Sequence, residues 1–519
     1  MGNLTLPQPT VIDRVFEAVA PVYAARRMQA RAGMAMYRQL YGGGYVAGRS
    51  DSTEMQEYAP WPGSAGEDIN PGLVAMRARA RDLARNAPIA TGAENTAVTG
   101  VIGSGLAAKP GPDREFLGLS DREADAWESR ARKLWELWAE STRCDIESEL
   151  NFYDLQELAF RNVLASGDVL VVHRWMEGDS LLQTRVQLIE ADRVSNPLHL
   201  QDTDRMVQGV ETDELGRTVR YHVQEGHPGD LRVVIGPTPY RWLSVSPYWP
   251  NGDRRAWLLY HKRRIGQRRG VPYLAPVIAP LKQLERYTTS ELMAALISSM
   301  FTVFVKTENP GSGSGLPGLE GSGTPERAGQ LRLGHGLVTE LLDGEEIETA
   351  NPGRPNAQFD PFVQAILRQT GVALEIPYEI LTKHFSSSYS ASRAALLEAW
   401  RFFRHRREWV ASHFCDPAYA AVISEGVASG LLDAPGFFDD PLVRSAWLGV
   451  QWAGDSMPQL DPMKEVNAAA KRVEEGFSTR ERESMELTGT DYEQNHAQRE
   501  KEERMRREAG LVPATVEAA

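Results

Sequence analysis

The hydrophobic periodicity of the chain changes near Asp168, and this change limits the possible folds more than any other feature of the sequence. Before it, three segments have the spacing of amphipathic helices: 73–87, 120–140 and 149–166. From Asp168 to residue 262, short β-branched runs alternate with Gly, Asp and Pro, which predicts antiparallel strands. The sequence therefore predicts an α+β protein whose strands form a block of their own.

The segment 120–140 carries a helix start signal and a candidate core face. Ser120 followed by Glu123 is the pattern of a capping box. Three tryptophans fall on one side of the predicted helix, and we expect them in the core: Trp127, Trp135 and Trp138.

Long helices return after the β-rich block. One is predicted from 281 to 303, about 35 Å long at 1.5 Å per residue. Its most apolar window, 292–305, is shorter than the roughly 20 residues that a membrane span needs, so we expect a buried helix. A glycine-serine loop at 309–324 and a second helix at 359–375 follow.

The stretch HFSSSYSASRAALLEAWRFFRHRREW, residues 384–409, joins a serine cluster to a further helix. Apolar residues at helical spacing mark one face: Leu396, Trp400, Phe403, Val410 and Phe414. Phe402 and Trp409 lie nearly opposite, so this helix is predicted to be buried on two faces. After residue 480 charge is dense and aromatics are sparse, which predicts a short helix and a frayed tail.

Charge and cysteine content restrict the class of protein. The 519 residues carry a formal net charge of −13, whereas proteins that hold duplex DNA tightly usually have a basic excess. The two cysteines, Cys144 and Cys415, are too few for a disulfide framework and are expected to be buried thiols. The N-terminus has no basic region followed by an apolar core, so no signal peptide is expected.

The serines at 386–388 allow two interpretations, an activated nucleophile or a flexible loop between helices. Activation needs a base within hydrogen-bond reach, and although His384 is near, neither a GxSxG elbow nor an SxxK motif is present. The sequence also lacks an HExxH motif, and no Lys-Ser/Thr follows the glycine-serine loop. We therefore favour a loop and predict no catalytic residue, no metal site and no cofactor.

Arg77, Arg81 and Arg85 recur every four residues and share one face of the helix 73–87. Two interpretations stay open for this stripe. It is either a solvated basic face or a subunit interface that pairs with acidic residues.

Several strings together give the chain a family resemblance: RARARDLARN (77–86), LIEADRVSNP (188–197), GQRRGVPYLAPVIAPLKQLERY (266–287), IPYEILTKHFSSSYSASRAALLEAWRFF (376–403) and LDPMKEVNAAAKRVEEGFSTR (460–480). In this order they resemble the portal protein of tailed bacteriophages, of the lambda type. The resemblance covers roughly residues 70–490.

The resemblance implies a portal fold with mainly helical wing, stem and crown, a β-rich wing segment and a small α/β clip, assembled as a ring. It implies these parts: an N-terminal arm at 1–70, a wing at 71–280 with the β-rich block 168–262, a first stem helix at 281–303, a clip at 304–356, a second stem helix at 357–382, a tunnel loop at 383–392, a long helix with wing and crown at 393–490, and a charged tail at 491–519.

The tunnel loop of such proteins touches DNA. The candidate channel residues that the resemblance implies here are Lys383, His384, Phe385, Ser386, Ser387, Ser388, Tyr389 and Ser390. We expect Lys383 and His384 to meet phosphates weakly, and Phe385 and Tyr389 to anchor the loop against neighbours. Each phosphate contact adds affinity, and a ring multiplies it, so every contact has to be weak for DNA to slide.

The resemblance also implies the partners. Portal proteins form a homo-oligomeric ring, usually of twelve subunits, at one capsid vertex of the virion, and they assemble in the host bacterial cytoplasm. Double-stranded DNA passes through the ring during packaging and ejection, and no membrane is involved. The implied protein partners are the terminase large subunit, the major capsid or scaffolding protein, and head-completion or adaptor proteins. The alternatives are another ring-forming head-tail or baseplate protein, a stationary DNA-binding protein and a serine hydrolase.

Overall fold

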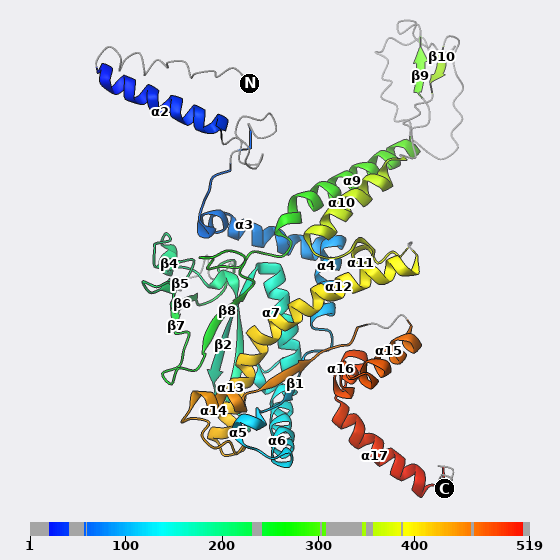
Figure 1. Ribbon diagram of the computed structural model, residues 1–519. Coiled ribbons are helices and arrows are strands. Elements are labelled where there is room, and N and C mark those ends of the chain that lie inside the picture. Colours follow the sequence, from blue (N-terminus) through cyan, green and yellow to red (C-terminus); the bar gives the residue numbers. More distant parts are fainter. Residues whose placement is uncertain are drawn as a thin grey trace, which may run out of the picture. The chain divides into compact units, whose positions relative to one another are not determined.

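The computed structural model describes residues 20–40, 57–58, 60–230, 241–300, 304–307, 345–348, 357–385, 388–457 and 461–511. The chain divides into two compact units, residues 1–64 and 65–519. The first contains helix α2 (Pro21–Leu40). The second is mostly helical with small antiparallel sheets (Figure 1).

Helices open the second unit: α3 (Ala65–Asn86), α4 (Pro88–Val101), α5 (Arg114–Leu117), α6 (Asp121–Ala139) and α7 (Phe152–Ser166). Helix α3 begins at Ala65, inside the segment 1–70 that the resemblance assigns to the N-terminal arm. The capping box at the start of α6 is confirmed, because the Ser120 side chain accepts the backbone N–H of Glu123 and the Glu123 carboxylate accepts that of Ser120. The three tryptophans of α6 are buried, as predicted.

The β-rich block forms two antiparallel sheets. The first has the order β3-β2-β8 and comprises β2 (Asp168–Trp175), β3 (Thr184–Glu190) and β8 (Ala256–Tyr260). The second has the order β4-β5-β6-β7 and comprises β4 (Met206–Val207), β5 (Val210–Thr212), β6 (Thr218–Gln224) and β7 (Trp242–Val245). Successive side chains of a strand face opposite sides. Val169 and Val171 therefore join the large helical core, whereas Leu170 and Val172 join a second core beneath the four-stranded sheet.

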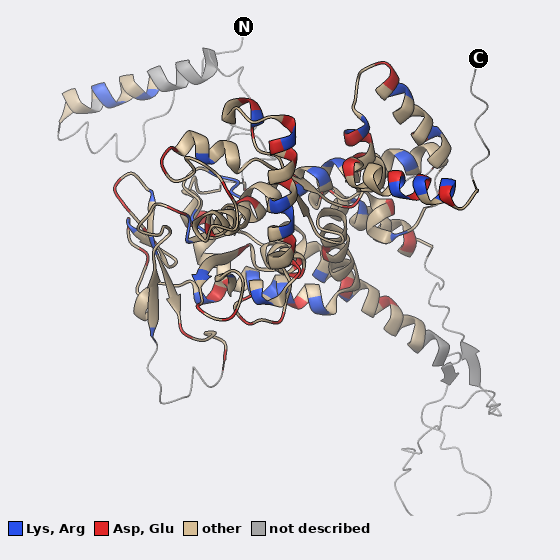
Figure 2. Ribbon diagram, turned by 90° about the horizontal axis from the view of Figure 1, so that it is seen from below, with Lys and Arg blue, Asp and Glu red and all other residues tan. Residues whose placement is uncertain are grey.

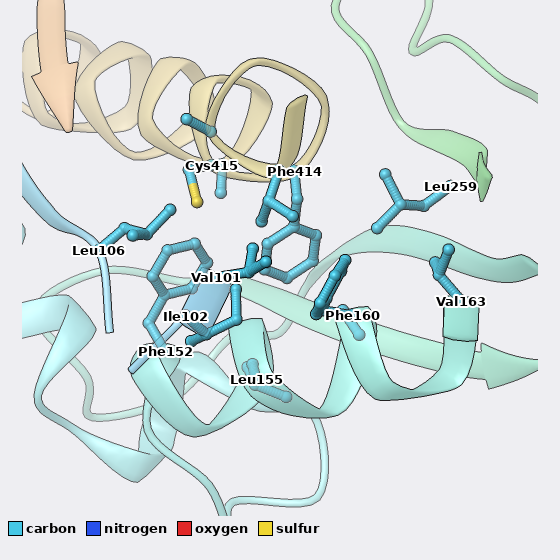
Figure 3. Packing of buried hydrophobic residues seen from close by; sticks show 14 of the residues in the cluster. Val101, Ile102, Leu106, Phe152, Leu155, Phe160, Val163, Leu259, Phe414 and Cys415 are labelled. Carbon is cyan, nitrogen blue, oxygen red and sulfur yellow. The ribbon is translucent and has the colours of Figure 1, made fainter. Parts of the chain in front are cut away.

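The large core includes residues of α4, α7 and β8 and of the helical segment that carries Phe414 and Cys415 (Figure 3). Phe152 at the start of α7 stacks on Phe414 with ring centroids 5.5 Å apart. Both cysteines are buried free thiols, and burial raises the pKa of Cys144 to about 12 and that of Cys415 well above its ordinary value. Their predicted role as small buried residues is confirmed.

Two long helices lie side by side and extend from this core: α9 (Ile278–Met300) and α10 (Phe359–Ala373) (Figure 1). Tyr287 of α9 contacts Phe359 and Phe362 of α10, with ring centroids 5.6 Å and 5.0 Å apart. The predicted burial of the apolar window 292–305 is wrong for the part described, because the two helices cover only one face of each other. Three large side chains of this window are exposed: Leu292, Met293 and Leu296.

Across the part of the chain that the structure describes, no helix has both the length and the apolarity to span a bilayer. Beyond α9, strands β9 (Phe304–Thr307) and β10 (Glu345–Glu348) pair antiparallel. The rest of the predicted clip 304–356, with its glycine-serine loop at 309–324, lies outside the described residues.

The predicted second stem helix 357–382 consists of two helices, α10 and α11 (Tyr378–Thr382). Glu375 has a φ of +56°, and Ile376 precedes a proline, which disfavours helical backbone at that residue. Both features end α10 before Pro377.

The chain then continues through α12 (Tyr389–Val410), a π-helical turn (Ala411–Cys415), α13 (Asp416–Ala428), α14 (Pro441–Trp447) and β11 (Val450–Ala453), which pairs with β1 (Ala107–Pro110). Helices α15 (Pro462–Glu474), α16 (Arg480–Thr488) and α17 (Tyr492–Glu508) complete the second unit.

The short helix predicted after residue 480 is α16, but the frayed tail predicted to follow it is helical over α17. Asp491 caps this helix by accepting the backbone N–H groups of Glu493 and Gln494. Basic and acidic residues alternate along it (Figure 2), and pairs such as Arg506–Glu503 support a solvated helix. Residues 512–519 lie outside the described part.

Candidate functional site

The candidate loop joins α11 to α12, and a helix cap fixes each of its ends. Lys383 ends α11 in the left-handed conformation, with a φ of +54°. Its backbone N–H and that of His384 both donate to the carbonyl of Glu379. At the other end, Ser388 is the N-cap of α12, and its hydroxyl accepts the backbone N–H of Ala391. The connection between the two caps is therefore short.

The structure corrects the boundaries of this loop. The sequence predicted loop from 383 to 392, but α12 begins at Tyr389, so Tyr389 and Ser390 belong to its first turn. Ser386 and Ser387 lie outside the described residues. The local reason is the serine cap, which supplies an acceptor for an N–H group that has no partner within the helix.

The described candidate residues share exposure to solvent. They are Lys383, His384, Phe385, Ser388, Tyr389 and Ser390. The aromatic members keep about half of their surface accessible, 52% for Phe385 and 53% for Tyr389. Within one subunit neither ring is held in the core, so their predicted contact with neighbouring subunits stays a prediction.

Helix α12 supports the loop from behind, because its inner face packs on α4. Phe403 lies against Gly100, where an added Cβ would come within 2.7 Å of the ring. Arg407 fastens the same contact: its Nε donates to the Val101 carbonyl at 3.0 Å and its Nη2 to the Gly100 carbonyl at 3.2 Å. These carbonyls end α4, so the guanidinium satisfies acceptors that the helix leaves open.

Tyr273 ties the end of α10 to the same helix. Its hydroxyl donates to the carbonyl of Leu374 at the end of α10, and its ring stacks on Phe402 of α12 with centroids 6.4 Å apart. Burial raises the pKa of the Tyr273 hydroxyl, which therefore stays a proton donor. The end of α10, the candidate loop and α4 consequently meet around α12.

The predicted arginine stripe does not lie on one solvated face. Arg77 is only 3% exposed, and its guanidinium pairs with Asp168 at 3.0 Å and donates to the Ser166 carbonyl at 2.8 Å. Arg81 is partly buried and pairs with Asp192. Arg85 is exposed. The solvated-face interpretation is wrong for Arg77, which is used within its own subunit. An interface role stays a prediction, with Arg85 as its accessible member.

Asp168 is the centre of a buried ionic cluster that sequence reasoning missed. Arg269 donates to both of its carboxylate oxygens, from Nε at 2.8 Å and from Nη2 at 2.9 Å. The same guanidinium also donates to the backbone carbonyls of Ala191, Val194 and Gln208. Burial alone raises the pKa of Asp168, but Arg269 and Arg77 outweigh it and hold that pKa below its ordinary value. The cluster joins α3, β2 and the segment that leads into α9.

The string GQRRGVP therefore has a structural meaning. Arg269 pairs with Asp168, and the backbone N–H of Gly270 donates to the same carboxylate at 2.7 Å. A side chain at Gly270 would overlap the backbone of Gly167, so the two segments approach as closely as their backbones allow. The signal in the sequence was the string itself, but its partner at Asp168 is about a hundred residues away.

The described part of the candidate site contains no arrangement for nucleophilic catalysis. Ser388 uses its hydroxyl as a helix cap, and His384 is exposed at the opposite end of the connection. The described residues contain no cluster of His, Cys, Asp or Glu that could hold a metal ion.

Comparisons with known proteins identify the family of this chain. Residues 51–407 match the family described as phage portal protein, lambda family. Portal protein B of Escherichia phage lambda is 26% identical, with 94% of each chain covered. The portal protein of Escherichia phage N15 is also 26% identical, with 92% of this chain and 93% of that protein covered.

Among solved structures, similar chains come from gene transfer agent particles. One, from the virion of the native particle, is 12% identical, covers 80% of this chain and 93% of its own, and has a TM-score of 0.43. Another, from the neck of the empty particle, is 13% identical, covers 85% and 99%, and has the same TM-score. At these scores the assignment rests on the family match instead. The chain belongs to the lambda family of phage portal proteins, which are structural, non-enzymatic components of the virion.

Proposed function

We propose that copies of this chain, usually twelve, form a ring. This ring is the DNA channel at one capsid vertex. Membership of the portal family implies an oligomeric ring in the virion neck. In the proposal a terminase motor packages viral DNA through the channel, and the DNA leaves the same way at ejection. The observation that carries it is the family match over residues 51–407, which includes both long helices and the loop before α12.

The loop from Lys383 to Ser388 is proposed to face the DNA. Its exposed residues and its two helix caps support this role, because a short connection between fixed ends can shift without unfolding its neighbours. Lys383 and His384 supply weak phosphate contacts. Helix α12 supports the loop through Arg407 and Phe403.

The proposed partners are those that the family resemblance implied. The terminase large subunit, and later the head-completion or adaptor proteins, dock on the clip at 304–356. The major capsid or scaffolding protein surrounds the wing. The alternative of a serine hydrolase is wrong, because the family is not enzymatic. A baseplate protein is disfavoured, since that alternative predicted no loop between two helices at this place.

The test is electron microscopy of the purified protein followed by packaging with terminase. We expect twelve-fold rings, and we expect the double variant Lys383→Glu/His384→Glu to form the same rings but to package less DNA. Wild-type protein that stays monomeric under all assembly conditions contradicts the ring. Variant rings that package DNA at the wild-type rate contradict the role of the loop.

A further inference from the structure

A basic turn leads from β8 into α9, and its conformation is fixed from within. The Gln267 side-chain carbonyl accepts the backbone N–H groups of Arg263 at 2.8 Å and of Arg264 at 3.2 Å. The Tyr260 hydroxyl donates to the backbone carbonyl of Gln267 at 2.8 Å. Gln267 is buried, so the turn is held rigidly against the body of the subunit. Its exposed residues are presented in one defined arrangement.

This turn and the end of α12 together form a cationic cluster of Lys262, Arg263 and Arg406, and the imidazoles of His261, His405 and His413 lie around it. Burial and then the charges of Arg406, Arg263, His405 and His413 lower the pKa of His261 to about 4. The two parts are also joined by an edge contact between His261 and Trp409, 6.1 Å between centroids. The cluster is therefore a single surface built from two elements.

Negative charge within the subunit compensates little of this cluster. Glu375 lies 3.4 Å from Arg406. The described residues supply no salt-bridge partner for Lys262 or Arg263, whose side chains are exposed. In a chain with a net charge of −13, such an unbalanced group of cations is a local exception. It predicts an acidic partner.

The tip of the turn shows which kind of partner fits. Ile265 is 99% exposed and stands between the basic residues of the turn. An apolar anchor within a charged rim is typical of a protein interface. Phosphate groups of nucleic acid offer the cations partners but give no reason for the isoleucine.

We propose that the cationic cluster and Ile265 dock on an acidic surface of a second copy of this chain. The inference rests on the ring of the proposed function and names one of its subunit contacts. A ring repeats one face against a different face, so a cationic face needs an acidic face on the neighbour. The chain can supply it, since exposed carboxylates without a salt-bridge partner in the described part include Glu140, Glu147 and Glu149.

The first test is charge reversal at the turn. The variant Lys262→Glu/Arg263→Glu places like charges in the contact, so we expect the protein concentration for half-assembly to rise about tenfold or more. The matched control is Arg122→Glu/Arg130→Glu on α6, which changes the same charge at exposed positions and is expected to stay within about twofold of wild type. Native mass spectrometry and sedimentation measure assembly, and thermal melting of the subunit verifies its folding.

The second test measures burial of the tip directly. Both native cysteines are buried, so Ile265→Cys provides a selective site for a maleimide. We expect slow labelling in the ring and fast labelling in dissociated subunits. Leu215→Cys, in the β5–β6 turn, is the exposed control and is expected to react at the same rate in both.

The outcomes separate this contact from the proposed function. If wild-type protein forms no ring, the proposed function fails and this contact fails with it. If wild-type rings form but the turn variant assembles equally well and Ile265→Cys reacts equally fast in both states, only this contact is overturned. If the turn variant forms unchanged rings that no longer retain duplex DNA, this contact is also overturned. Nucleic acid is then the partner of the turn.

Discussion

At the scale of single residues, Asp168 decides how three distant segments meet. Its carboxylate is fully buried and accepts from Arg77, Arg269 and the backbone N–H of Gly270. Burying an ion pair gives little net stability by itself, but removing one partner leaves the other charges buried without compensation. The strings RARARDLARN and GQRRGVP, which carry the family resemblance, are thus held together by one side chain.

Replacing this carboxylate is predicted to destabilise the subunit strongly. Asp168→Asn leaves two buried guanidinium groups facing a neutral amide, so we expect a loss of about 3–5 kcal/mol in the free energy of unfolding. Urea denaturation followed by circular dichroism measures it. Asp121→Asn, in an exposed pair with Arg114, is the matched control and is expected to have a much smaller effect. Equal effects of the two variants would contradict the importance of the buried cluster.

The same residue predicts a dependence of stability on pH. Because the pKa of Asp168 is lowered by folding, its ionised form stabilises the folded state at pH values above its unfolded pKa of about 3.9. This contribution is lost as the pH falls through the folded pKa. The stability difference between wild type and Asp168→Asn should be constant from about pH 7 to pH 5 and should narrow below about pH 4. If this difference in the free energy of unfolding widened as the pH fell, folding would raise the pKa of Asp168 and not lower it.

At the scale of elements, α12 determines where the candidate loop stands. Its inner face meets α4 at Gly100, and Arg407 fastens it to the end of that helix. Beyond Val410 a π-helical turn leads into α13, so that Phe414 stacks on Phe152 in the large core (Figure 3). The element behind the loop is therefore anchored at several points.

The fit at Gly100 gives a prediction for the α4–α12 contact. Gly100→Ala forces the Phe403 ring away, and such overpacking costs about 1–3 kcal/mol. Gly92→Ala in the same helix is the control, because an added Cβ there meets nothing within 4 Å and the substitution should stabilise α4 by about 0.5–1 kcal/mol. Thermal unfolding distinguishes the two. A Gly100→Ala protein as stable as the Gly92→Ala protein would mean that α12 does not pack tightly on α4.

At the scale of the whole molecule, the net charge and the exposed apolar surface bear on how strongly the protein binds DNA. The net charge is −13, and helices α9 and α10 carry few charged residues along their described part (Figure 2). The side chains of Leu292, Met293 and Leu296 stay exposed in the single subunit. A subunit with these properties is suited to assembly with other proteins more than to tight binding of phosphates.

The acidic charge predicts weak binding of duplex DNA. We expect a dissociation constant in the range of non-specific binding, about 10⁻⁴–10⁻⁶ M at physiological salt, and a shallow salt dependence. Fluorescence anisotropy with labelled duplexes of unrelated sequence measures both. Lys383→Glu should weaken this binding further without changing assembly. Nanomolar affinity with a steep salt dependence would favour a stationary DNA-binding protein instead.

The sequence by itself determined most of the elements and their order, because their signals are local; α17 and the division between α10 and α11 were the exceptions. The capping box at Ser120, the helix after the serine cluster and the strands after Asp168 each depend on residues within a few positions of one another, and all three were confirmed. The family resemblance depends on such strings and was confirmed too.

Only the tertiary structure decided which polar residues face inward and where the loop ends. Arg77 has the spacing of a surface residue, and its burial depends on Asp168 and Arg269, which lie far along the chain. The helix start at Tyr389 depends on how the Ser388 side chain is oriented. The exposure of Leu292 depends on which face of α9 is covered by α10. Periodicity reports that a face exists, but what covers that face is set by partners that only folding or assembly brings near.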